Sequence, residues 1–88
     1  MDIVNFLGPK LSEIINKDVS PCKGLIRFAI KDAGKNPNLL TYKDINEIVN
    51  KELKIRLDQV NIPELDQVIS QLNEIVIKNQ SVFTMSIF

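Results

Sequence analysis

The sequence contains no histidine, no tryptophan and only one cysteine, Cys22, among its 88 residues. Histidine is the side chain most often used as a general base and as a metal ligand near neutral pH. Its absence removes most of the ways in which so small a chain could catalyse a reaction or hold a metal ion. We therefore expect a non-catalytic protein with no catalytic residues, no metal site and no cofactor.

The single cysteine also excludes a disulfide within the chain. A lone thiol fits the reducing conditions of the cytoplasm, where we expect the protein to act. Cys22 falls on the same helix face as Leu25, Ile26 and Ala29, and free cysteines are among the most buried residue types. The pattern predicts a buried structural thiol rather than a reactive one.

Long apolar runs and an excess of one charge are missing as well. The densest apolar run, residues 25–30, contains Arg27 and is far shorter than the about 18 residues that a membrane helix needs. The first seven residues have an acid at position two, so we expect no signal peptide. Eleven basic residues balance eleven acidic ones, and the net charge does not point to nucleic acid or to a membrane surface. The length fits a single small helical domain over residues 1–88.

Apolar residues recur every three or four positions in four segments, which predicts helices over residues 9–17, 21–33, 41–57 and 63–77. Ser20 followed by Pro21 is a helix start signal, and Thr41 with Asp44 three residues later is a weak variant of the capping box. Gly34 is a typical helix stop. We expect a mainly α fold, a compact bundle of about four helices.

The last eight residues, 81–88, alternate between apolar and polar side chains and predict a carboxy-terminal β-strand. A single strand needs a partner for its backbone groups. Three partners are open: residues 2–6, residues 75–78 folded back as a hairpin, or the same strand in a second copy. We favour the first and the third, because the turn at Asn79 and Gln80 lacks the residues that short hairpins prefer.

This strand also predicts how the protein associates. Exposed on a monomer, its apolar side chains would be an aggregation hazard, and a partner protein or a second copy would remove that hazard. We therefore expect a homodimer that self-associates through helix faces and through the apolar residues of the strand, which are Val82, Phe83, Met85, Ile87 and Phe88.

The second predicted helix carries a stripe of basic residues. Lys23, Arg27 and Lys31 recur every four positions, and Lys35 follows just beyond. Such a stripe is either a solvated outer face or a docking surface for an acidic helix, a peptide or a phosphate backbone. Basic residues outnumber acidic ones up to residue 56 and the reverse holds afterwards, so the acidic fourth helix of another copy is one candidate partner.

The order of the elements resembles a winged helix, with helices at 21–33, 41–57 and 63–74 and a wing at 75–78 and 81–87. That resemblance implies a third helix that reads the major groove of DNA. In this chain the third helix carries Glu64, Asp66 and Glu74 and no base before Lys78, which argues against nucleic-acid binding by that helix.

Two functions from different classes remain. The first is a non-catalytic, self-associating protein-interaction or regulatory domain. The alternative is a nucleic-acid-associated regulator of winged-helix type that contacts phosphate through Lys23, Arg27, Lys31 and Lys35.

Overall fold

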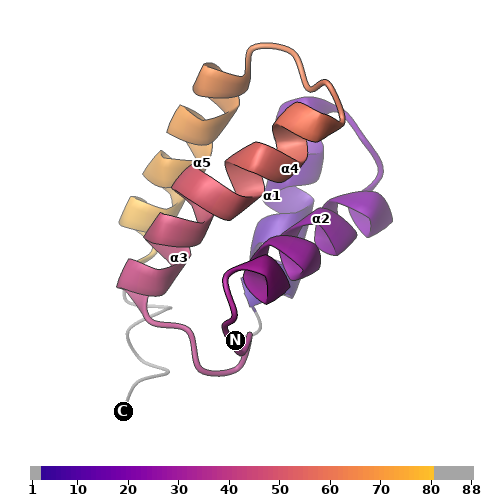
Figure 1. The fold of residues 1–88 in the computed structure, drawn as a ribbon. Coiled ribbons are helices and arrows are strands. Elements are labelled where there is room, and N and C mark those ends of the chain that lie inside the picture. The colour runs from indigo at the N-terminus through magenta and orange to yellow at the C-terminus, as the bar shows by residue number, and fades with distance from the viewer. Residues whose placement is uncertain (1–2, 81–88) are drawn as a thin grey trace.

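The computed structural model describes residues 3–80. They form α1 (Ile3–Ile15), α2 (Val19–Asp32), α3 (Tyr42–Ile48), the π-helical segment η1 (Val49–Leu53), α4 (Lys54–Gln59) and α5 (Leu65–Lys78). Because α3, η1 and α4 follow one another without a break, they make one long helix. The described part of the chain is thus a mainly α globule of four helices, as predicted, and contains no strand (Figure 1).

The long helix is the element on which the others are arranged. Figure 1 shows α5 and α2 on its two sides, with α1 behind, and α1 packs against both α2 and α5. Side chains from all of these helices meet in one core. Its largest fully buried side chains are Leu7, Leu11, Cys22, Val49, Leu53, Leu57, Leu72 and Val76.

The π-helical turn keeps the apolar side chains of the long helix aligned. Ile45, Val49, Leu53 and Leu57 are each four residues apart, whereas an α-helix turns once in about 3.6 residues. A regular helix would therefore carry these side chains progressively around its axis. Hydrogen bonds in η1 span one residue more than in an α-helix and take up the excess. All four side chains remain at most 3% exposed.

The start of α1 differs from the prediction. The spacing predicts a helix from Pro9, but α1 begins at Ile3 and contains Pro9 in its interior. An interior proline costs about 3 kcal/mol or more. Ile3, Val4 and Leu7 are buried in the core, and each contributes about 1.5–3 kcal/mol when fully buried. Burial of these three side chains outweighs the cost of the proline, and the prediction of a start at Pro9 is wrong.

The start of α2 differs from the prediction, whereas its end is where the sequence predicts it. Asp18, not Ser20, precedes the first helical residue. At the other end Gly34 has a φ of 70°, which glycine adopts readily. The N–H of Lys35 donates to the carbonyl of Ile30 at 3.2 Å, and that of Gly34 to Lys31 at 2.9 Å. This pair of bonds is a Schellman motif and confirms Gly34 as the stop.

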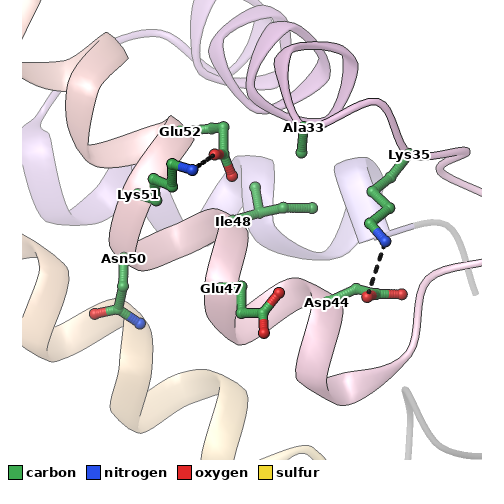
Figure 2. A pocket seen from close by; sticks show the side chains of 8 residues that line it. All are labelled: Ala33, Lys35, Asp44, Glu47, Ile48, Asn50, Lys51 and Glu52. Atoms are coloured by element: carbon green, nitrogen blue, oxygen red, sulfur yellow. Dashed lines mark ion pairs between the residues drawn. The ribbon is translucent and has the colours of Figure 1, made fainter.

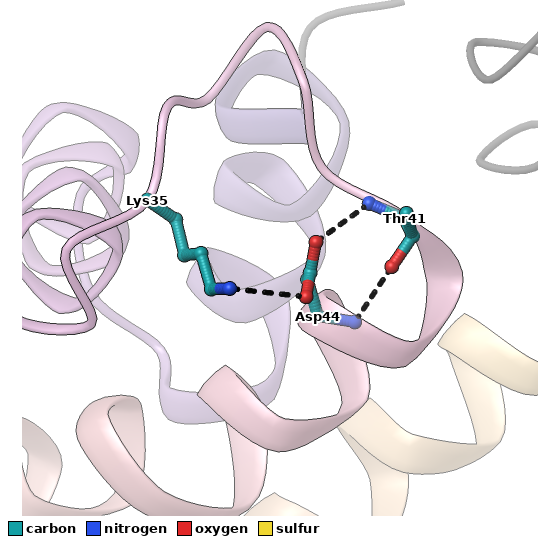
Figure 3. Close-up of polar contacts among 3 residues, drawn as sticks. All are labelled: Lys35, Thr41 and Asp44. Carbon is teal, nitrogen blue, oxygen red and sulfur yellow. Dashed lines mark hydrogen bonds and ion pairs between the residues drawn. The ribbon is translucent and has the colours of Figure 1, made fainter.

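The capping box at the start of α3 is confirmed. The N–H of Thr41 donates to Oδ2 of Asp44, and the N–H of Asp44 donates to Oγ1 of Thr41, both at 3.1 Å (Figure 3). The backbone bond from Thr41 lowers the pKa of Asp44, and Lys35 Nζ, 3.6 Å from Oδ1 of Asp44, acts in the same direction. The loop after α2 is thereby tied to the first turn of α3.

The last helix runs further than the winged-helix alternative allows. α5 begins at Leu65, after Glu64 in the left-handed region, and continues through residues 75–78. Residues 3–6 likewise belong to α1. Residues 3–6 and 75–78, the described parts of the two proposed intramolecular strand partners, are thus helical and bury side chains in the core. The predicted strand, residues 81–88, lies outside the described residues.

Replacement of Thr41 by alanine removes one half of the capping box. We expect Thr41→Ala to lower the free energy of unfolding by about 0.5–2 kcal/mol, as loss of a helix cap does in other proteins. Urea denaturation measures it. Ser70→Ala, at an exposed position on α5, is the matched control and should change little. An unfolding free energy for Thr41→Ala equal to that of the unaltered protein would contradict a stabilising cap.

Candidate interaction surface

Within residues 3–80, six large apolar side chains are exposed: Val19, Phe28, Leu39, Ile55, Val60 and Ile77. Two of them, Phe28 on α2 and Val60 just after α4, are each about half exposed, at 52% and 51%. They line the same groove, which has a volume of about 500 Å³. Its other apolar lining residues come from the end of α1, from α2 and from the connection between α4 and α5: Ile15, Pro21, Cys22, Leu25 and Ile62.

The inner wall of the groove is formed by buried side chains. Cys22 is fully buried, as predicted, and Ile62 is nearly so. Burial raises the pKa of the Cys22 thiol, and the charge of Asp18 raises it further. The thiol therefore stays protonated at neutral pH and packs as an apolar group.

One edge of the groove is held by Arg56 of α4. Its guanidinium donates two hydrogen bonds to the carboxylate of Asp32, at 2.7 and 2.9 Å. The same guanidinium lies 5.1 Å from the centre of the Phe28 ring. Arg56 lowers the pKa of Asp32 mainly through these bonds. This triad joins α4 to α2 and fixes the position of the aromatic ring.

The four residues of the predicted basic stripe lie in different surroundings. Lys23 is half-buried, because its side chain runs over Gly8 of α1. Lys35 pairs with Asp44. Arg27 and Lys31 are exposed, and no carboxylate within residues 3–80 forms an ion pair with either. Of the four residues, only Lys35 forms an ion pair within residues 3–80, and of the three on α2 only Arg27 and Lys31 are fully classed among its exposed residues.

A second hollow, of about 460 Å³, lies between the end of α2 and the long helix. Figure 2 shows that its lining is mostly charged and that Lys51 points toward Glu52, with 3.7 Å between Nζ and Oε2. Lys35 and Asp44 pair on its far side. Asn50 turns away and exchanges two amide hydrogen bonds with Asn73 of α5, at 2.8 and 2.9 Å. These contacts stabilise the junction of the helices.

Within the part of the chain that the structure describes, no three cysteine or carboxylate side chains gather closely enough to hold a metal ion. None of the helices between residues 3 and 80 is long and apolar enough to cross a membrane. No family model, no curated protein and no solved structure matches the chain. The function is therefore inferred from the side chains themselves.

Sequence reasoning missed the groove and the triad beside it. The sequence does show a wide apolar arc on the second helix, which includes Leu25 and Phe28, and this arc is one reason to expect an interaction domain, but it does not reveal a groove. The sequence could not show that Val60 and Arg56 lie beside α2, because they are far from α2 along the chain and come close to it only in the folded protein.

The triad predicts a pH effect that depends on Arg56. The folded-state pKa of Asp32 lies below its ordinary value of 3.8, so the stabilisation is complete above that value and is lost as the pH falls through the lowered pKa. Arg56→Met should return the pKa of Asp32 toward 3.8, as measured by NMR titration of the carboxyl carbon. Arg27→Met, which removes an arginine from the same surface, should leave the titration unchanged. An unaltered Asp32 titration in Arg56→Met would contradict the triad.

Proposed function

We propose that the protein is a non-catalytic protein-interaction domain that self-associates as a homodimer. The observation that carries this proposal is the groove beside α2, with Phe28 and Val60 half exposed at its edges. Isolated apolar side chains are common on protein surfaces, but apolar groups gathered around a concave surface are typical of docking sites.

The energetics favour a partner over water at this site. Full burial of an aromatic or aliphatic side chain contributes about 1.5–3 kcal/mol relative to exposure. Phe28 is the largest of these exposed side chains, and its ring is already held by Arg56, so little conformational entropy is lost when a partner covers it.

The reactive side chains that the protein has support a binding role rather than catalysis. The single thiol is enclosed in the core, and the sequence has no histidine to activate it. The predicted contribution of Val82, Phe83, Met85, Ile87 and Phe88 to association remains a prediction of the sequence, since these residues lie outside the described part.

The oligomeric state tests the proposal. Light scattering over a wide range of protein concentration should show a mass that rises from the 10.0 kDa of one chain toward twice that value. Because association buries mainly apolar surface, we expect the dimer to persist in high salt. A mass of one chain at every concentration would overturn the proposal.

The reactivity of Cys22 tests the non-catalytic part. A thiol reagent should modify the native protein far more slowly than the urea-unfolded protein, because the sulfur is buried and its pKa is raised. Mass spectrometry over time measures both rates. Rapid modification of the native protein would show an accessible thiolate and contradict the structural role of this residue.

A further inference from the structure

Gly8 of α1 and Gly24 of α2 differ in what an added Cβ atom would contact. A Cβ at Gly8 would lie 2.5 Å from Cγ of Lys23, so the packing of α1 against α2 accounts for that glycine. A Cβ at Gly24, in the middle of α2, would meet no atom within 4 Å. Glycine in a helix interior weakens the helix. Nothing inside the described chain explains why α2 carries one there.

Gly24 belongs to a face of α2 that looks outward. Gly24 and Leu25 are each three or four residues from Pro21 and from Phe28, so the four share one side of the helix, and all of them line the groove. A helix surface without a Cβ at its middle lets the backbone of another helix approach closely. Gly24 thus has a role if a second helix crosses α2 at this point.

We propose that α2 of a second copy packs antiparallel against this face, with the two helices crossing between Gly24 and Leu25. The proposal rests on the self-association argued above and names its surface. A two-fold dimer needs one patch that is complementary to itself. This patch combines a protruding side chain, Phe28, with a groove on the same helix. With the crossing between Gly24 and Leu25, Phe28 lies level with Pro21 of the partner, so each ring enters the groove of the other copy.

The charges at the two ends of α2 fit the same arrangement. Lys17 and Asp18 precede the helix, and Lys31 and Asp32 lie in its last turn. When two α2 helices are paired antiparallel about the point between Gly24 and Leu25, Asp18 is level with the partner's Lys31, whereas Asp32 is already bonded to Arg56 of its own chain. Each end of the paired helices therefore holds one pair of opposite charges, Asp18 of one copy and Lys31 of the other.

The size of the face sets the expected affinity. α2 has 14 residues, which corresponds to a length of about 21 Å. Two such helices with the flanking residue Val60 bury less surface than a standard stable interface. We expect a reversible dimer that forms and dissociates with protein concentration.

Two substitutions test the crossing point and the protruding ring. In Gly24→Leu the new Cβ meets no atom of the monomer and the helix propensity rises, so the chain should still fold, yet its dimer dissociation constant should rise at least about tenfold. Phe28→Ser should have the same effect on association. Ile77→Ser is the matched control, since Ile77 on α5 is also 52% exposed and should leave the constant unchanged. Sedimentation equilibrium measures the constants, and circular dichroism checks the fold.

A charge exchange tests the antiparallel direction. Asp18→Lys sets two lysines level with each other, and Lys31→Asp sets two aspartates level, so each single variant should weaken the dimer. The double variant restores opposite charges across the interface and should recover affinity. Failure of the double variant to exceed both single variants would overturn the antiparallel arrangement.

The outcomes separate this proposal from the function on which it rests. If Gly24→Leu and Phe28→Ser dimerise as tightly as the unaltered protein, the α2 surface is wrong and self-association stands. If only a chain ending at Gln80 loses the dimer, residues 81–88 and not α2 mediate it. If the unaltered protein is a monomer throughout, both proposals fail.

Discussion

The alignment of apolar side chains along the long helix is the constraint on which the rest of the structure depends. Val49 and Leu53 lie in the π-helical turn, and this turn packs against both α2 and α5. Without the extra residue that the turn absorbs, Leu57 would rotate away from the core and α4 would lose its contact with α2. The groove, the Arg56 triad and the placement of Val60 all follow from that contact.

The same constraint determines which apolar side chains of α2 remain exposed. Ile26 and Ile30 are buried in the core, whereas Phe28, at the edge of the apolar face of α2, remains exposed. A chain of this length buries only a modest share of its surface, roughly 60% for a domain of about 60 residues. Leu25 and Phe28 are therefore left at a groove, and the open space at Gly24 lies beside them.

Local signals in the sequence were sufficient wherever neighbouring residues decide the structure. The four helices, the capping box of Thr41 and Asp44, the stop at Gly34 and the burial of Cys22 are confirmed. The start of α1 is wrong, because burial of side chains before Pro9 outweighs a local preference. The π-helical turn and the groove were not predicted, since both depend on contacts between residues far apart in the chain.

The most direct measurement of the central claim is the position of the contact between two copies. Amide chemical shifts of the nitrogen-15-labelled protein should change on dilution, and the changes should be confined to residues 17–32 and 60–62. This pattern is expected if one α2 covers another. Shifts that stay constant on dilution in this region, or that change only along α5, would contradict the account.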